Sequence, residues 1–458
     1  MRFTIQLRIT DDEGREIADD EIISLDKSDD RLEAIGLSLG EAKDLLSHLQ
    51  QRVVQAQAAS YVADRRRCEH CSRPFRSKGH YPMRFRTPFG TVEVASPRFH
   101  RCGCQPANGK TFSPLTELFT EHTAPELLYL ETKWASLVAY DVTVNLLKDV
   151  LPIGDKANAE TVRNHLHKMA ARAEAELGEE RACFIDGCPA TWKTLPHPEG
   201  PIVVGIDGGF VRSSEDKKNH FQVIVGKSVP EDRADRSFGF VQCFDPKPKR
   251  RLFEVLRSQG LQSNQEITFL TDGGDDVRGL ARHMSPCAEH ILDWVHIALR
   301  LTVLGQYAKG LAHHDRKEAE EIETDLEKIK WYLWHGNVRQ ALFRAEWVAE
   351  GVESLENDYP GLKRFAKTAK EFWIYIDNNA AAIPNYGERW RYGERIATSF
   401  AESTVNTVVS KRFAKKQQMQ WSKKGAHLLL QTRTKVLDGT PREMFVRWYP
   451  AMAVNDTN

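Results

Sequence analysis

The sequence predicts a multidomain α+β protein in which an α/β domain is interrupted by an all-helical insertion and preceded by smaller modules. Three observations predict this class. Short apolar runs that end on acidic residues begin at residue 201, a strongly charged helical stretch occupies 314–380, and four cysteines fall within 37 positions. With 458 residues and 41% apolar content, the chain is long enough for about three domains with buried cores.

Composition and hydropathy exclude several classes of protein. The mean hydropathy is −0.50, and no apolar run approaches the roughly 20 residues of a membrane helix. Met1–Thr10 is too short and too soon followed by acidic residues to be a signal peptide. Eight cysteines are too sparse for a disulfide scaffold. We therefore expect a cytoplasmic protein with no membrane partner.

The net charge of zero hides three charged blocks. Residues 1–60 carry 13 acidic and 7 basic residues, whereas 61–120 carry 11 basic and 4 acidic ones. Residues 403–435 contain no acid and eight basic side chains: Lys411, Arg412, Lys415, Lys416, Lys423, Lys424, Arg433 and Lys435. Basic blocks of this kind indicate phosphate binding, because each contact releases condensed counterions. A solvated charged face is the alternative for any single block.

The amino-terminal part predicts two strands, Phe3–Ile9 and Glu21–Leu25, and a helix over Leu39–Ala63. Ser38 precedes Glu41 by three residues, which is a capping-box spacing. The serine also lies in a Gly-x-Ser-x-Gly pattern that is typical of hydrolases. That pattern requires a strand before the serine, and the acidic residues there exclude one. We interpret Ser38 as a helix cap.

Two cysteine pairs flank a predicted hairpin over 83–95. Paired cysteines joined by strands are typical of zinc ribbons, in which four thiolates hold a structural Zn²⁺. The second pair has one intervening residue instead of two or more, so His70 or His100 remains open as a replacement ligand. Free thiols in a loop are the alternative reading. The predicted ligands are Cys68, Cys71, Cys102 and Cys104.

Residues 125–177 predict three short helices, with Asn158 as the cap of the third. A short helix, a turn and a polar, basic helix form the layout of a helix-turn-helix, whose last helix lies in the major groove. Arg163 and Lys168 on that helix are then candidates for DNA contact. An ordinary helical bundle with a solvated face explains the same pattern about as well.

Carboxylates follow two of the apolar runs after residue 201. The run over 201–206 leads into Asp207-Gly-Gly, and the run over 266–271 leads into Asp272-Gly-Gly. Three strands, a helix, a strand, a helix and a strand is the order of a ribonuclease H-like domain. Carboxylates at strand ends bind Mg²⁺, and a metal pair supports phosphoryl transfer. A simple turn is the usual reading of any one Asp-Gly.

Four motifs resemble those of bacterial insertion-sequence transposases of the ISKra type, which are ribonuclease H-like DDE enzymes. They are Asp207-Gly-Gly-Phe-Val-Arg212, Asp293-Trp-Val-His-Ile297, Glu402-Ser-Thr-Val-Asn406, and Gln418-Met-Gln-Trp-Ser422 with Gly425-Ala-His-Leu-Leu-Leu-Gln431. The resemblance covers most of the chain. It implies that Asp207, Asp272 and Glu402 bind two Mg²⁺ or Mn²⁺ ions, with Glu402 on a helix after the insertion. It also implies that Asp293 and His296 support the active site.

Two interpretations are open for some of the residues singled out above. Trp421 stacks on an unpaired base or, by a small margin the favoured reading, belongs to the core. His296 contacts the scissile phosphate or, preferably, fixes the helix through Asp293. His313 and His314 are interpreted as a polar loop. The remaining cysteines are expected to be buried thiols: Cys183, Cys188, Cys243 and Cys287.

The sequence therefore predicts a transposase that cuts transposon ends and joins the 3′-hydroxyl to target DNA, as a homodimer or larger assembly at the bacterial nucleoid. A catalytically silent DNA-binding protein and a stand-alone nuclease are the alternatives. The expected segments are a strand–helix segment (1–64), a zinc-ribbon-like domain (65–120), a helix-turn-helix-like domain (121–198), the first part of the catalytic core (199–310), the helical insertion (311–387), and the second part of the core with the basic carboxyl terminus (388–458).

Overall fold

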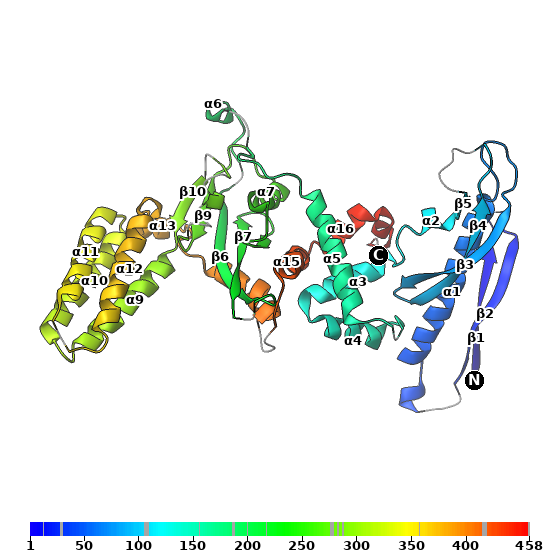
Figure 1. Ribbon diagram of the computed structural model, residues 1–458, viewed down its shortest axis with the longest axis horizontal. Helices are drawn as coiled ribbons and strands as arrows, with labels where there is room; N and C mark the ends of the chain where they lie inside the picture. Colours follow the sequence, from blue (N-terminus) through cyan, green and yellow to red (C-terminus); the bar gives the residue numbers. More distant parts are fainter. Residues whose placement is uncertain are drawn as a thin grey trace. The chain divides into compact units, whose positions relative to one another are not determined.

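The computed structural model divides into two compact units, Met1–Met169 with Gly439–Asn458, and Ala170–Asp438 (Figure 1). The last residues of the predicted 388–458 segment thus belong to the first unit. No helix among the residues that the structure describes is both long and apolar enough to cross a bilayer. Those residues are 1–11, 13–27, 31–104, 110–154, 156–185, 188–198, 200–216, 218–274, 279–281, 284–285, 288–356, 358–414 and 419–456.

The first unit begins with an antiparallel hairpin, β1 (Arg2–Thr10) and β2 (Glu16–Asp26), followed by the helix α1 (Leu39–Asp64). The predicted capping box is confirmed, since Ser38 Oγ accepts a hydrogen bond from the Glu41 N–H at 3.2 Å and Glu41 Oε2 accepts one from the Ser38 N–H at 2.7 Å. The predicted hairpin over 83–95 is part of a longer one, β3 (Ser77–Thr87) and β4 (Gly90–His100), which the short β5 (Thr111–Phe112) extends.

The three helices predicted over 125–177 are present in the first unit and at its border. They are α3 (Pro125–Leu137), α4 (Tyr140–Val150) and α5 (Ala159–Glu176), and Asn158 Oδ1 accepts a hydrogen bond from the Thr161 N–H at 2.9 Å, as a cap should. The short α2 (Leu115–Leu118) precedes them. The chain returns to this unit with α16 (Pro441–Trp448) and η4 (Pro450–Asp456), and Phe445 of α16 packs edge-on against Tyr129 of α3.

The second unit is built on a five-stranded sheet with the order β10-β9-β6-β7-β8. β6 (Ile202–Arg212), β7 (His220–Pro230) and β8 (Arg236–Val241) are antiparallel, whereas β9 (Ile267–Thr271) and β10 (Ala288–Leu292) run parallel to β6. α7 (Pro248–Ser258) joins β8 to β9 and buries Leu252 and Leu256 against one face of the sheet. The short α6 (Pro189–Trp192) precedes the sheet.

One prediction about β6 is wrong in detail. The strand does not end before Asp207 but continues to Arg212, paired with β7 along its whole length. The parallel pairing with β9, however, stops at Ile206 opposite Thr271. Asp207 and Asp272 therefore directly follow the last residues of the pairing between β6 and β9. This still brings both carboxylates to the same place on the sheet.

The charged stretch after β10 is helical, as predicted, but its bundle already begins at Trp294, within the range that the sequence analysis assigned to the catalytic core (199–310). α9 (Trp294–Leu311), α10 (Arg316–Trp334), α11 (Val338–Ser354) and α12 (Leu362–Asn378) form a ring in which each helix packs on its two neighbours (Figure 1). Their shared apolar core continues into the β10 side of the sheet through Leu270 and Ile291. His314 pairs with Asp358 at 3.0 Å within this bundle. The elements η2 (Ala380–Ala382) and α13 (Tyr386–Arg391) lead back to the sheet.

The helix after the insertion lies on the sheet face opposite α7. α14 (Ser399–Val405) and the π-helical η3 (Asn406–Ala414) pack on β6, and α15 (Lys423–Leu437) packs on β8. A Cβ atom at Gly205 would lie 2.6 Å from the Phe400 ring, and one at Gly209 would lie 3.2 Å from Val405. The glycines of β6 thus let α14 approach the strand closely. They explain part of the Gly-rich pattern that the sequence alone suggested was a turn.

The remaining cysteines do not behave as buried thiols. Cys183, Cys188 and Cys243 are exposed, which corrects the prediction, and Cys287 lies outside the described residues. All three exposed cysteines lie in loops of the second unit, and none belongs to the buried apolar clusters found among the described residues.

Gly205→Ala should destabilise the second unit by about 1–3 kcal/mol, because the added methyl group overpacks the contact with Phe400. Chemical denaturation should show a lower midpoint. Gly351→Ala is the matched control, since it lies within α11 with nothing within 4 Å of the new Cβ, and it should be neutral or slightly stabilising. Equal midpoints for the two variants would contradict the proposed close packing.

Candidate active site and metal centres

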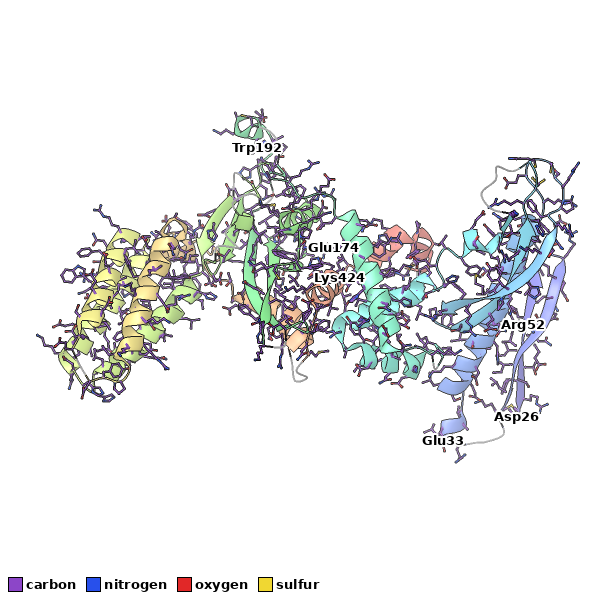
Figure 2. All side chains as sticks on the ribbon, viewed as in Figure 1. Asp26, Glu33, Arg52, Glu174, Trp192 and Lys424 are labelled. Atoms are coloured by element: carbon purple, nitrogen blue, oxygen red, sulfur yellow. The ribbon has the colours of Figure 1, made fainter. Side chains whose placement is uncertain are left out.

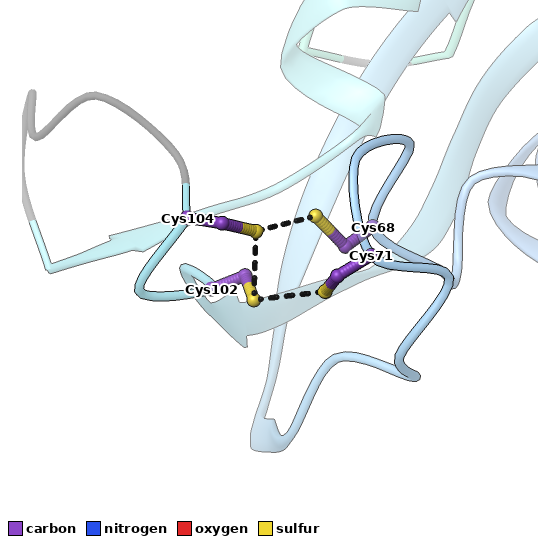
Figure 3. A group of neighbouring side chains, drawn as sticks. All are labelled: Cys68, Cys71, Cys102 and Cys104. Atoms are coloured by element: carbon purple, nitrogen blue, oxygen red, sulfur yellow. Dashed lines mark hydrogen bonds between the residues drawn. The ribbon is translucent and has the colours of Figure 1, made fainter.

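The four predicted cysteines converge on one point (Figure 3). The first pair lies in a tight loop just after α1, in which the Cys68 N–H donates to Arg73 O at 2.9 Å and the Ser72 N–H donates to Cys68 O at 2.7 Å. Ser72 has a φ of 56°, a left-handed conformation that the loop requires. The second pair follows directly after β4. The hairpin therefore brings together two loops that are distant in sequence.

The sulfur atoms have the spacing of a tetrahedral metal site. The Sγ–Sγ distances are 3.3 Å for Cys68–Cys104, 3.4 Å for Cys71–Cys102 and 3.3 Å for Cys102–Cys104. A Zn–S bond of about 2.3 Å gives tetrahedral edges of about 3.8 Å, only slightly longer. Four thiols complete such a site without His70 or His100. The donor set fits a closed, structural Zn²⁺ rather than a catalytic one.

The thiols influence one another's ionisation. The backbone N–H of Cys104 and the neighbouring thiols lower the pKa of Cys102 to about 7, and the adjacent Cys102 raises the pKa of Cys104 to about 12. The pKa of Cys68 is lowered as well, chiefly by a backbone hydrogen bond from Cys71, so negative charge forms more readily on some of these thiols than on others. A divalent cation would remove the repulsion between neighbouring thiolates, and its binding displaces the thiol protons.

α5 is the last of the three predicted helices and the one expected to contact DNA. Acidic residues of the first unit hold it in place. Glu131 of α3 is buried and pairs with His165, which fixes the two helices to each other. Arg163 and Lys168 are exposed, as DNA contacts require. Arg163 pairs with Glu160 at 3.2 Å and Lys168 with Glu121 at 3.2 Å. Arg163 can exchange the exposed Glu160 for a phosphate at little cost, since surface ion pairs are weak. Lys168 is held more firmly, because its partner Glu121 is half-buried.

The carboxylates of the predicted triad are neighbours in the second unit. By strand alternation Asp207 projects on the same face of β6 as Gly205, towards α14. Burial raises the pKa of Asp207, and the nearby Asp272 and Glu402 carboxylates raise it further while His296 opposes them. Asp272 in its turn and Glu402 on its helix are therefore near enough to Asp207 to influence its ionisation.

The turn that carries Asp272 is supported by the helical insertion. The Gly274 N–H donates to Asp272 Oδ1 at 3.0 Å, and the Tyr375 hydroxyl of α12 donates to the Asp272 carbonyl oxygen at 3.0 Å. Gly273 has a φ of +87°, and a Cβ there would meet Leu292 at 2.7 Å and Asn379 at 2.8 Å. Neither the backbone conformation nor the space allows another residue at this position.

Asp293 clamps two segments of the chain together, and it also belongs to a group with His296 and Glu402 that lies close enough to hold a metal ion. Its side chain is fully buried and accepts three hydrogen bonds, from the Val295 N–H at 2.6 Å, the Thr398 N–H at 2.8 Å and the Thr398 hydroxyl. The same carboxylate thus caps α9 and fixes the residue that begins α14. Glu402 lies one turn further along, since its N–H donates to Thr398 O at 2.9 Å.

His296 faces the carboxylates. Its Nε2 atom lies 3.5 Å from Glu402 Oε1 and 4.0 Å from Asp293 Oδ2. That nitrogen is buried and makes no hydrogen bond to the residues that the structure describes. A buried polar atom without a partner is costly, so this geometry fits a group that a ligand completes. Glu402 itself is about half exposed, with a side-chain exposure of 45%.

Oxygen-rich groups of this kind suit hard divalent cations. Asp207, Asp272 and Glu402 offer carboxylate oxygens, which Mg²⁺ and Mn²⁺ prefer, and their mutual repulsion would be relieved by bound cations. Among the described residues of the second unit, two groups have ligand atoms close enough to hold a metal ion: Asp293 with His296 and Glu402, and Glu174 with Asp245 and His427. In the latter group, however, the positively charged Arg251 guanidinium already pairs with Glu174 and Asp245. The arginine therefore balances their charge without a metal ion.

This second cluster is a buried ion-pair network that the sequence analysis missed. Arg251 of α7 is 5% exposed and donates to Glu174 at 2.7 Å, to Asp245 at 2.9 Å and to Gln431. Burial raises the pKa of Glu174, but hydrogen bonds from His427 and Arg251 outweigh it and lower the pKa to about 2. Glu174 lies on α5 (Figure 2). No local pattern marks residues so far apart in sequence.

The basic carboxyl-terminal block separates into buried and exposed side chains. Arg412 and Trp421 are buried, the guanidinium lies 5.1 Å from the indole ring, and Phe413 packs on the same ring. This corrects their assignment to DNA contact and agrees with the alternative of a core tryptophan. Arg433 is also buried and donates to the carbonyl oxygens of Thr407 and Val408.

The exposed part of this block is smaller than predicted. Lys411 and Lys424 are exposed and Lys423 is half-buried, the last two at the start of α15 (Figure 2). Lys415 and Lys416 lie outside the described residues.

Comparisons with known proteins give no family for this chain. A scan against protein-family models finds no match, and a search of curated proteins finds none either.

Thr398→Val should remove the hydroxyl donor from the buried Asp293 carboxylate while keeping the shape of the side chain. We expect a loss of about 1–3 kcal/mol of stability. If the chain cleaves DNA, as its sequence motifs lead us to expect, and Asp293 positions α14, cleavage should fall in kcat with little change in the KM for DNA. Thr398→Ser keeps the hydroxyl and should restore kcat. Equal kcat values for the Val and Ser variants would contradict the positioning role.

Cys68→Ser should abolish the bound zinc, because one of four converging thiolates is lost. Elemental analysis of protein purified without chelator measures this directly. Cys243→Ser is the control, since that thiol is exposed and lies outside the described cluster, and its zinc content should equal that of the wild type. Wild-type protein without zinc would remove the assignment.

Proposed function

We propose that this chain is a metal-dependent DDE transposase of the ribonuclease H-like superfamily. It cleaves DNA at transposon ends and joins the freed 3′-hydroxyl to target DNA. The observation that carries the proposal is geometric: Asp207 and Asp272 directly follow the last residues paired between β6 and β9, and Glu402 lies on α14, which packs on β6. These are the three carboxylates that the resemblance to ISKra-type transposases implies.

The sheet supports the same superfamily. If β6 is taken as the first strand, the order β8-β7-β6-β9-β10 reads 3-2-1-4-5, with the second strand antiparallel to its neighbours and the last two parallel to the first. This arrangement is typical of ribonuclease H-like domains. The helical bundle lies between β10 and α14, where the resemblance requires the insertion.

Each residue then has a role that follows from its position. Asp207 and Asp272 are held by the sheet and by the turn beside Tyr375, so they provide a rigid half of the site. Glu402 is held by α14 and is more exposed, so it provides the half that faces the substrate. A pair of bound Mg²⁺ or Mn²⁺ ions would activate the attacking oxygen and stabilise the leaving one. His296 Nε2 is near enough to Glu402 to donate to it or to a phosphate oxygen.

The remaining expectations concern partners. The cysteine-bearing module and the helices α3–α5 would recognise the transposon ends, and Lys411, Lys423 and Lys424 would contact phosphates beside the carboxylates. Two ends must be joined in one event, so a homodimer or larger assembly in the bacterial cytoplasm belongs to the same proposal. A catalytically silent DNA-binding protein descended from a transposase is the alternative. Replacing one of the three carboxylates distinguishes the two, because only an active transposase has cleavage activity to lose.

Glu402→Gln should abolish cleavage and strand transfer while DNA binding survives. The substitution keeps the size of the side chain but removes a negative charge that would offset the divalent ions, so both reactions should fall by orders of magnitude. The assay uses Mg²⁺ and DNA that carries the repeats flanking the gene.

Glu394→Gln and Glu388→Gln are the matched controls. Glu394 forms an exposed ion pair with Arg389, and Glu388 is exposed at the start of α13. Both should cleave like the wild type. A Glu402→Gln protein with normal activity would overturn the assignment of the triad, and an inactive wild type with normal DNA binding would favour the silent alternative.

A further inference from the structure

Charge is segregated within the first unit. α1 packs between the two hairpins: Arg52 pairs with Asp20 of β2 at 3.7 Å, whereas Val54 and Ala58 pack against Val92 and Val94 of β4. Arg52 is labelled in Figure 2. Most of the acidic residues of the 1–60 segment lie on or beside the β1–β2 hairpin, and the basic ones of 61–120 lie on the other side of α1. The helix thus separates an acidic hairpin from a basic module.

The β3–β4 hairpin has two different faces. Met83 and Phe85 point towards α1, opposite Val94 and Val92. Arg84 and Arg86 alternate with them, so they project away from α1, opposite Glu93 and Thr91. Both arginines are exposed. Among the described residues, Arg84 with Glu93 at 3.0 Å is the one ion pair on this outward face.

Further exposed cations lie at the start of β3 and in the loop that carries the first cysteine pair. Lys78 is exposed at the irregularity between Ser77 and Gly79. Four arginines of the neighbouring loop are exposed as well: Arg66, Arg67, Arg73 and Arg76. A strand rises about 3.4 Å per residue, so Lys78 and Arg86 are on the order of 27 Å apart. Arg86 is therefore too distant from the cysteine end of the hairpin to neutralise the negative charge of a zinc–thiolate centre.

We propose that this outward face, defined by Lys78, Arg84, Arg86 and the four loop arginines, binds the phosphate backbone of duplex DNA. The inference rests on the proposed function and deepens it, because it specifies which face of the cysteine-bearing module contacts DNA and that it contacts the phosphate backbone. A two-stranded ribbon can follow a DNA groove, and residues two apart on a strand place cations about 6.8 Å from one another. The acidic β1–β2 hairpin, on the far side of α1, would repel DNA and so fixes which side of the module binds.

The surface is tested with the full-length triple variant Lys78→Gln, Arg84→Gln, Arg86→Gln. Binding to a 30-base-pair duplex of arbitrary sequence is measured between 50 and 300 mM salt. Each lost phosphate contact lowers the slope of log affinity against log salt by about 0.9, so the slope should fall by about 2 to 3. The matched control neutralises three exposed cations of the helical bundle, Arg316→Gln, Lys317→Gln and Lys367→Gln, and should keep the wild-type slope.

Two further readouts make the outcome specific. Zinc content should stay at the wild-type value in the triple variant, because the substituted side chains are not ligands. An unchanged slope, or an equal fall in the control, overturns the surface even when the wild type cleaves DNA. If the slope falls as expected but Glu402→Gln cleaves like the wild type, the surface stands and the proposed chemistry fails.

Discussion

The close approach of α14 to the glycines of β6 is the contact on which the candidate active site depends. Glu402 can reach Asp207 because Gly205 and Gly209 leave no side chain between helix and strand. Gly205 and Gly209 contribute no side-chain packing to the sheet, but their lack of a side chain allows α14 to lie close to Asp207. Burial, and to a lesser degree the nearby Asp272 and Glu402 carboxylates, raise the pKa of Asp207, and the surrounding structure has to hold the acids in place.

Buried hydrogen bonds from elsewhere in the chain provide that support. Asp293 joins the end of β10, the start of α9 and the residue before α14 through a single carboxylate. Tyr375 and Asn379, from the end of the insertion, contact the turn that carries Asp272 and Gly273. The helical bundle is thus more than a separate module. It supplies part of the wall behind the site, and its core is continuous with the sheet at Leu270 and Ile291.

The basic blocks of the chain have different physical roles. In the carboxyl-terminal block, Arg433 binds the carbonyl oxygens of Thr407 and Val408, which a π-helical segment leaves available. Burial and the nearby Arg412 lower its pKa to about 10, and the guanidinium still satisfies its donors within the protein. In the cysteine-bearing module, by contrast, the cations alternate with core residues along a strand and face the solvent.

Local sequence determined much of this protein. The capping box at Ser38, the hairpin between the cysteine pairs, the strands around Asp207 and Asp272, and the helical bundle after β10 all follow from periodicity and turn chemistry that act over a few residues. The four cysteines and the acidic motifs were identified for the same reason, since their chemistry is visible in the residue types. Only the tertiary structure decided that β6 runs on past Asp207, that Trp421 and Arg412 are buried, and that Arg251 joins Glu174 to Asp245. Those outcomes depend on which segments, distant in sequence, pack together in the folded protein. A single buried polar or aromatic side chain leaves no periodic pattern in the sequence around it.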